Sequence, residues 1–312
     1  MSNRPLVLVV GPTSRAGAQA LRDRLQSVEV ILRPSADEAL DVADAATVVI
    51  VGGPTLSRDF LARACNLQLV YRLGSSRAAR AESEALRART VHVTGPPPGL
   101  SAAATGEHAL ALLLALTRRL LDADRYVRSG SWSVPSAFDD TSRELGSLTI
   151  GIVGLGRAGA HLARLLQPFG TRVVYTRRSG PDPTVPGEFL SLPKLLNVAD
   201  AVSLHVRAAP GSFRFGDDEF GALRNGTWFV NTSRPHLVDH EALLRALDER
   251  LAGAGLDVFP DEPRVDPRLL VHPRVVLTPH AAGRTAEAAA RYYGHASRIA
   301  LAAIRRSTRV QE

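Results

Sequence analysis

The sequence has few features of secreted or membrane proteins. It contains one cysteine, Cys65, which excludes an internal disulfide and fits a reducing cytoplasm. The longest purely apolar run, residues 109–116, is far too short to cross a bilayer. The apolar residues 6–10 are too few for a signal-peptide core, and no small-residue cleavage site follows them closely. We therefore expect a cytoplasmic protein that does not interact with a membrane.

Lysine is almost absent. Lys194 is the only one, so nearly all the positive charge behind the net value of +7 belongs to arginine. A basic chain invites a nucleic-acid interpretation, but these arginines are scattered in runs of no more than two and are not interleaved with aromatic residues. We expect no nucleic-acid partner. The hydrophobic content of 45% and the length of 312 residues are those of a globular protein with two domains.

The most informative stretch is LTIGIVGLGRAG, residues 148–159. A strand-like apolar run leads through Gly154, Gly156 and Gly159 into residues of helical period. In such a turn the first glycine makes the tight bend, the second admits a pyrophosphate, and the third lets helix and strand pack closely. The N-terminus of the helix then offers free N–H groups to the anion. This context predicts dinucleotide binding, with a purely structural turn as the alternative.

Short β-branched runs alternate with alanine- and arginine-rich helical stretches, which predicts parallel sheets covered by helices. We expect an α/β protein with two doubly wound parallel-sheet domains, in which a Rossmann dinucleotide-binding domain (101–283) is inserted into a flavodoxin-like substrate-binding domain (1–100 and 284–312). A single long helix is expected from Ser101, as its cap, to about Arg128. Residues 285–305 should form a helix that packs on the first domain. The expected strands are 6–10, 28–32, 47–51, 68–72 and 91–93, then 149–153, 171–176, 200–204, 227–231, 252–256 and 274–277.

The end of the second strand after the glycine turn indicates which dinucleotide is used. NAD-binding domains usually carry a carboxylate there for the ribose 2′-hydroxyl. This chain instead has Thr176, Arg177, Arg178 and Ser179. Arginine binds a phosphate bidentately and hydroxyls add donors, so we predict that NADP(H) is preferred and NAD(H) is possible. Two solvated arginines are the alternative interpretation.

Three polar residues follow apolar runs of the second domain, where ligands of open α/β sheets bind. Arg234 lies in NTSRP, Glu262 in GLDVFPDEP and His280 in VVLTPHAAG. Together they suit reduction of a ketone by hydride from a nicotinamide. The histidine donates the proton, the carboxylate holds the imidazolium form, and the arginine binds a substrate carboxylate and polarises the carbonyl. Taken singly, each could be a structural histidine, a turn residue or a surface cation.

In these and other segments the chain resembles the D-isomer-specific 2-hydroxyacid dehydrogenase family, which includes glyoxylate/hydroxypyruvate reductases. The resemblance runs through GEHALALLLALTRRL (106–120), VRSGSW (127–132), GIVGLGRAG (151–159), NTSRPHLVDHEALLRAL (231–247), AGAGLDVFPDEP (252–263) and VVLTPHAAG (275–283). It implies that Arg234, Glu262 and His280 are catalytic and that Asp257 holds the nicotinamide carboxamide. It also implies a homodimer built through the nucleotide domains, with the VRSGSW segment in the interface.

The resemblance completes the set of candidate residues, in which no metal ligand is included. The cofactor-binding prediction covers Thr105, Gly154, Leu155, Gly156, Arg157, Ala158, Gly159, Thr176, Arg177, Arg178, Ser179, His205, Thr232 and Asp257. The substrate-binding prediction covers Gly53, Leu73, Gly74, Ser75, Ser76 and Arg77.

Departures from the family pattern cluster around the expected pocket. The glycine-rich loop that should hold the substrate carboxylate reads RLGSSRAAR, residues 72–80, and the loop beside the nicotinamide reads VRAAP, residues 206–210. Pro235 replaces the usual glycine after the catalytic arginine. These changes suggest a substrate other than glyoxylate or hydroxypyruvate. Arg77 or Arg207 could serve a second anionic group, or either could be solvated.

The predicted function is therefore NAD(P)H-dependent reduction of a 2-keto acid to a D-2-hydroxy acid, or the reverse. Two alternatives remain: a specialised oxidoreductase acting on a phosphonate, a phosphite or a secondary-metabolite intermediate, and a non-catalytic dinucleotide-sensing interaction protein. The second is disfavoured by the expectation that the chain begins and ends with its folded domains.

Overall fold

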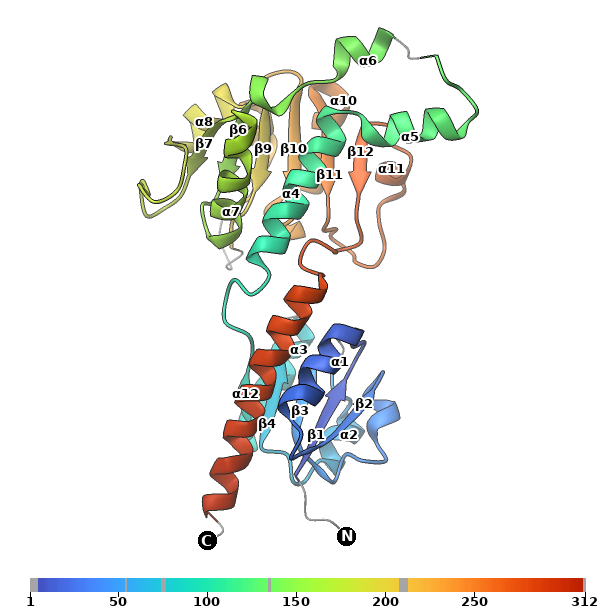
Figure 1. The fold of residues 1–312 in the computed structure, drawn as a ribbon, viewed down its shortest axis with the longest axis vertical. Coiled ribbons are helices and arrows are strands. Elements are labelled where there is room, and N and C mark those ends of the chain that lie inside the picture. Colours follow the sequence, from blue (N-terminus) through green and yellow to red (C-terminus); the bar gives the residue numbers. More distant parts are fainter. Residues whose placement is uncertain (1–4, 54, 74–76, 134–135, 208–212, 311–312) are drawn as a thin grey trace. The chain divides into compact units, whose positions relative to one another are not determined.

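The computed structural model describes residues 5–53, 55–73, 77–133, 136–207 and 213–310. The chain divides into two compact units (Figure 1), Met1–Leu100 with Thr285–Glu312 and, between them in sequence, Ser101–Arg284. Among the described helices, none combines the length and the hydropathy that a membrane span needs.

The first unit contains a five-stranded parallel sheet. Its elements are β1 (Leu6–Val10), α1 (Arg15–Arg24), β2 (Glu29–Arg33), η1 (Asp37–Ala39), β3 (Ala46–Val51), α2 (Arg58–Arg63), β4 (Leu69–Arg72), α3 (Arg77–Ala88), β5 (His92–Thr94) and α12 (Ala286–Val310). The strand order β2-β1-β3-β4-β5 is that of the flavodoxin-like fold. Helix α12 packs on α1, and the strand–helix alternation and the returning helix are as predicted.

The second unit contains a seven-stranded parallel sheet. Its elements are α4 (Ala102–Thr117), α5 (Leu120–Arg128), α6 (Ser136–Thr141), η2 (Leu145–Ser147), β6 (Thr149–Val153), α7 (Arg157–Leu166), η3 (Gln167–Phe169), β7 (Arg172–Thr176), β8 (Glu188–Phe189), α8 (Leu192–Val198), β9 (Ala201–Leu204), α9 (Asp217–Gly221), β10 (Thr227–Asn231), η4 (Pro235–Leu237), α10 (His240–Glu249), β11 (Leu251–Leu256), α11 (Pro267–Leu270) and β12 (Val275–Leu277). The order β12-β11-β10-β9-β6-β7-β8 is that of a Rossmann sheet extended by one strand, with its switch point between β6 and β9.

Local sequence signals explain where several helices begin. Side chains of Ser14, Ser57 and Asp239 accept hydrogen bonds from the first-turn N–H groups of α1, α2 and α10. Each such cap stabilises its helix by about 1 kcal/mol. Strands β1 and β10 are buried along their whole length, as expected for strands covered by helices on both faces.

The predicted long helix from Ser101 to Arg128 is wrong, because the structure has two helices. Helix α4 ends at Thr117, whose carbonyl accepts the N–H of Arg143, and Arg119 takes a left-handed φ of 49° before α5 begins. A tertiary hydrogen bond thus interrupts a stretch of uniformly helical composition. Ser101 occupies the predicted N-cap position of α4, but its side chain makes no capping hydrogen bond.

Helix α4 packs on the second sheet, against β10 and β11. Gly255 of β11 allows this close approach, since a Cβ atom there would lie 3.0 Å from Cβ of Leu112. By contrast, α5 has no buried residue among those described and extends away from the sheet (Figure 1). The second unit therefore combines a packed sheet of the dinucleotide-binding type with an arm, helix α5, which is not covered by the core of that unit.

Candidate active site

The glycine turn after β6 has the geometry that a dinucleotide requires. Gly154 has a φ of +95°, and a Cβ atom there would lie 2.8 Å from backbone atoms of His205 and Val206. A Cβ at Gly159 would lie 2.6 Å from the carbonyl oxygen of Gly154. A Cβ at Gly156 would meet nothing within 4 Å. The first and third glycines are therefore required by packing within the protein, whereas the second leaves open space at the N-terminus of α7.

Two buried polar atoms that follow strands of the same sheet have no hydrogen-bond partner among the described residues. They are Oγ1 of Thr232, after β10, and Nδ1 of His205, after β9. The other ring nitrogen of His205 lies 2.9 Å from Oγ of Ser203, and burial lowers the pKa of this histidine to about 4. Buried polar atoms without partners are rare in folded proteins and suggest a ligand. Together with the open space at Gly156, they fit a dinucleotide.

The two arginines after β7 differ in their surroundings. All three guanidinium nitrogens of Arg177 bond within the turn that follows: Nη1 lies 2.6 Å from Asp182, Nε 2.6 Å from the Gly180 carbonyl and Nη2 3.5 Å from that of Pro181. Arg178 is exposed, and no partner is found for it among the described residues. Thr184 and Arg177 bond to the carboxyl group of Asp182 and lower its pKa. The structure therefore separates one arginine that shapes the turn from one that is free for a ligand.

The remaining cofactor candidates lie around the same edge of the sheet. Leu155 is buried within the glycine turn, Arg157 and Ala158 begin α7, and Thr176 ends β7. Thr105, in the first turns of α4, donates its hydroxyl to the Ser101 carbonyl. Ser179 is exposed beside Arg178.

The three predicted catalytic residues follow three neighbouring strands. Arg234 comes after β10, Glu262 after β11 and His280 after β12, and these strands are adjacent and parallel. The backbone before Arg234 is fixed by Asn231, whose side chain binds the Ser233 N–H and the Arg234 carbonyl. The exposed Arg234 side chain itself donates to the Ser233 carbonyl at 2.7 Å. Among the described residues, no direct contact joins it to Glu262 or His280.

Glu262 and His280 are in direct contact. Oε2 of Glu262 lies 2.7 Å from Nδ1 of His280, and Oε1 accepts the N–H of Phe259 at 3.0 Å. The histidine side chain is 43% exposed and the glutamate 33% exposed. Since Nδ1 faces the carboxylate, Nε2 is the ring nitrogen left for a ligand. The pair can therefore hold an imidazolium and release a proton from its outer nitrogen.

Asp257 directly follows β11 and is fully buried. One oxygen accepts the Thr278 hydroxyl at 2.6 Å and the Ala281 N–H at 2.7 Å, and the other accepts the Ala282 N–H at 2.9 Å. Its carbonyl accepts the N–H of His280 at 2.9 Å. The side chain predicted to hold a carboxamide is therefore also the anchor of the loop that carries His280.

The predicted substrate residues lie in the first unit. Gly53 follows β3 with a φ of +100° and open space at its Cβ position. Leu73 follows β4, and its N–H is bonded to the Val51 carbonyl. Gly74, Ser75 and Ser76 lie outside the described residues, as does the side chain of Arg77. In the second unit, Arg207 is exposed.

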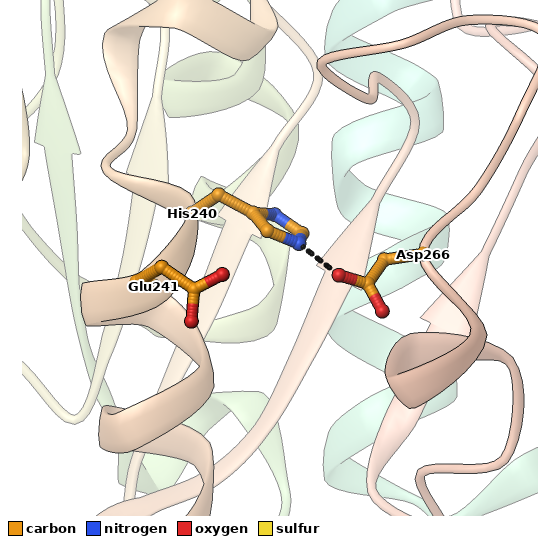
Figure 2. Close-up of side chains that lie close together, drawn as sticks. All are labelled: His240, Glu241 and Asp266. Carbon is orange, nitrogen blue, oxygen red and sulfur yellow. Dashed lines mark hydrogen bonds and ion pairs between the residues drawn. The ribbon is translucent and has the colours of Figure 1, made fainter.

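A cluster that sequence analysis missed holds the far end of the loop that carries Glu262. His240 and Glu241 begin α10, and Asp266 precedes α11. The imidazole of His240 faces Asp266 (Figure 2), and its Nε2 lies 2.8 Å from Oδ2 of Asp266. These three have the spacing of a possible cation site, but Arg268 bonds to both Glu241 and Asp266 and supplies the positive charge. Arg268 and His240 also lower the pKa of Asp266. The cluster is an ion-pair network that fixes the loop.

Comparison with known proteins gives consistent matches. Residues 110–282 match the family model of the D-isomer-specific 2-hydroxyacid dehydrogenase NAD-binding domain. A glyoxylate reductase of Korarchaeum cryptofilum is 40% identical over 215 residues, which cover 65% of this chain and 63% of that enzyme. The chain thus matches under two thirds of that relative's length.

Solved structures match along nearly the whole chain. A protein of Thermus thermophilus is 33% identical, with a TM-score of 0.81 and coverage of 96% of this chain and 97% of that one. The NADPH-dependent glyoxylate/hydroxypyruvate reductase of Sinorhizobium meliloti, solved with citrate, is 27% identical with a TM-score of 0.78, and the match covers 94% of this chain and 93% of that one.

Proposed function

The chain belongs to the D-isomer-specific 2-hydroxyacid dehydrogenase family, and we propose that it interconverts a 2-keto acid and a D-2-hydroxy acid with a nicotinamide dinucleotide. A nicotinamide cofactor, when bound, would supply or accept the hydride at the substrate carbon. The observation that carries the proposal is the contact between Glu262 and His280, at the edge of the sheet where the glycine turn also lies.

His280 provides the proton that the reaction needs. When hydride adds to the carbonyl carbon, the oxygen gains negative charge and takes a proton from Nε2 of the imidazolium. The Glu262 carboxylate, which contacts Nδ1, fixes the orientation of the ring and stabilises its positive charge before the transfer. In the oxidation direction, the neutral ring accepts the hydroxyl proton as hydride leaves.

Arg234 is the proposed partner of the substrate carboxylate and carbonyl. It is exposed after β10, on a backbone that Asn231 holds rigid. A guanidinium can bind a carboxylate with two parallel hydrogen bonds and polarise an adjacent carbonyl. We also propose substrate-binding roles for Gly53 and Leu73, which follow β3 and β4, and retain the prediction for residues 74–77.

For the cofactor we propose a preference for NADP(H), with Arg178 and Ser179 as the groups that bind the 2′-phosphate. Arg178 is exposed without a partner among the described residues, whereas Arg177 is engaged in its own turn. The role predicted for Arg177 thus becomes that of shaping the turn. The Sinorhizobium meliloti relative is described as NADPH-dependent, which agrees with this assignment.

We further propose that the protein is a homodimer. Helix α5 has no buried residue among those described, yet it and the segment after it carry exposed apolar side chains. These are Leu120, Leu121, Val127 and Trp132. An apolar arm of this kind is typical of a surface that is covered in an assembly.

The single cysteine, exposed Cys65, supports a reducing cytoplasmic setting.

A panel of 2-keto acids tests the proposed function. Each acid is added to the protein with NADPH, and the loss of absorbance of the reduced nicotinamide is followed. Turnover of at least one acid at a rate typical of enzymes, about 1–1000 per second, is the expected result. A panel without turnover, from a protein that binds NADPH, would contradict the enzyme and favour a dinucleotide-sensing protein.

A further inference from the structure

His108, on α4, contacts the loop that carries His280 although 170 residues separate it from Thr278. Its Nε2 lies 2.9 Å from Oγ1 of Thr278 and 3.6 Å from Oδ1 of Asp257. The side chain of His108 is 22% exposed, while that of Asp257 is fully buried. The resemblance assigned neither His108 nor Thr278 a role.

His108, Thr278 and Asp257 form a series of two hydrogen bonds. The number of available protons fixes the direction of each bond. A carboxylate only accepts, so the Thr278 hydroxyl gives its single proton to Asp257 at 2.6 Å. Oγ1 can then act only as an acceptor toward His108. Nε2 of His108 must therefore carry a proton and donate it. The result is a directed chain from imidazole N–H to hydroxyl to carboxylate, in which each bond polarises the next.

The Asp257 carboxylate, which accepts the last of these hydrogen bonds, holds the backbone on both sides of His280. Asp257 binds the Thr278 hydroxyl and the N–H groups of Ala281 and Ala282. Between these anchors His280 takes a φ of +52°, a left-handed conformation that non-glycine residues rarely adopt. Such a conformation persists only where surrounding contacts impose it.

We propose that His108 is a positioning residue for His280: through Thr278 and Asp257 it fixes the backbone conformation that places the imidazole against Glu262. His108 keeps the Asp257 carboxylate and the Thr278 hydroxyl in one arrangement, so the loop cannot relax to an ordinary φ. The role of His280 as proton donor belongs to the proposed function. His108 determines only where the His280 ring is held.

Three substitutions distinguish the effect of the His108 N–H donor from the effect of side-chain volume. His108→Leu removes the N–H but keeps an apolar group of similar size, and Thr278→Val removes the hydroxyl almost isosterically. His108→Gln retains an N–H donor near the position of Nε2. The matched control is His272→Gln, since His272 precedes β12 whereas Thr278 follows it. Thermal unfolding verifies that each variant is folded.

The measurements are kcat and KM for a 2-keto acid that the wild type reduces, the Kd of NADPH, and the imidazole ¹H–¹⁵N resonances of His280. His280→Asn identifies those resonances by their loss. We expect His108→Leu and Thr278→Val to lower kcat at least tenfold and to shift the His280 resonances. KM and Kd should change less than twofold. His108→Gln and His272→Gln should resemble the wild type.

The proposal is overturned if His108→Leu leaves kcat and the His280 resonances unchanged. It is also overturned if the Kd of NADPH weakens in parallel with the loss of kcat, because the network would then act on the cofactor through Asp257. If the wild type reduces no 2-keto acid, the proposed function fails. The His280 resonances then decide alone: a shift in both His108→Leu and Thr278→Val supports the positioning role, and no shift refutes it.

Discussion

Nδ1 of His280 lies 2.7 Å from Oε2 of Glu262, and the two residues are delivered by loops that follow adjacent strands. The glutamate is itself fixed, because its other oxygen holds the N–H of Phe259. Glu262 therefore holds the ring at Nδ1, and the Asp257 carbonyl holds the backbone N–H of His280. This arrangement leaves one ring nitrogen, Nε2, free to exchange a proton with a substrate.

A substitution in the glycine turn should weaken dinucleotide binding without changing the stability of the fold. A Cβ at Gly156 meets no protein atom within 4 Å, so Gly156→Ala should fold with an unchanged melting temperature. The added methyl group would occupy the space through which a pyrophosphate approaches the backbone. We expect the Kd of NADPH, measured by calorimetry, to rise at least tenfold.

Gly159→Ala is the matched control for that variant. Its Cβ would lie 2.6 Å from the Gly154 carbonyl, so this substitution should destabilise the fold by about 1–3 kcal/mol. Normal NADPH binding by Gly156→Ala would mean that the dinucleotide does not approach the backbone there.

Cofactor preference should depend on Arg178 more than on Arg177. With Arg178→Gln we expect the Kd of 2′,5′-ADP to rise about tenfold, or about 1.4 kcal/mol, while that of 5′-AMP changes less than twofold. Arg177→Gln should instead weaken both nucleotides similarly, since Arg177 holds the turn through Asp182 and Gly180. A wild-type KM for NADH equal to or below that for NADPH would refute the proposed 2′-phosphate site.

The exposed side of α5 predicts how the homodimer can be disrupted. Val127, 51% exposed, lies on α5, whereas Val271, 82% exposed, follows α11. Val127→Asp should convert the dimer to a monomer in light scattering after size exclusion, and Val271→Asp should leave it intact. A wild-type monomer, or a dimer that persists in Val127→Asp, would show that α5 is not the interface.

Because His205 has a lowered pKa, the protein should be less stable in mild acid. Burial lowers its pKa to about 4, whereas the unfolded chain binds that proton near 6.5. Between these values the unfolded state binds more protons, so the free energy of unfolding falls as the pH falls from 6.5 toward 4. From pH 7.5 to pH 5 this residue should account for about 2 kcal/mol of lost stability. Urea unfolding of His205→Gln should show a correspondingly smaller loss, and equal losses would contradict the assignment.

Much of the fold could be predicted because parallel strands buried on both faces appear as short, continuous apolar runs. Such a run, TIGIV, places β6, and the glycines after it predict the turn. Strand β8 could not be predicted, because Glu188 and Phe189 are only two residues and both are exposed. The break after Thr117 depends on the N–H of Arg143, which the helical composition of that segment does not reveal.

The candidate site was partly predictable for a similar reason. Polar residues directly after strand-like runs meet at one edge of a parallel sheet, and Glu262 and His280 do so. His108 escaped prediction because its partner lies 170 residues away, and nothing in a helix of alanine and leucine marks it. The engagement of Arg177 with Asp182 likewise depends on the shape of a turn rather than on a motif.

Whether His280 supplies the proton is decided by one comparison of variants. Wild type, His280→Ala and, as control, His92→Ala, an exposed residue of β5, are assayed with NADPH and a 2-keto acid that the wild type reduces. We expect His280→Ala to lower kcat by about 10²–10⁴-fold while the Kd of NADPH stays within twofold of the wild-type value. The control should retain full activity. A wild-type kcat in His280→Ala would show that His280 does not supply the proton.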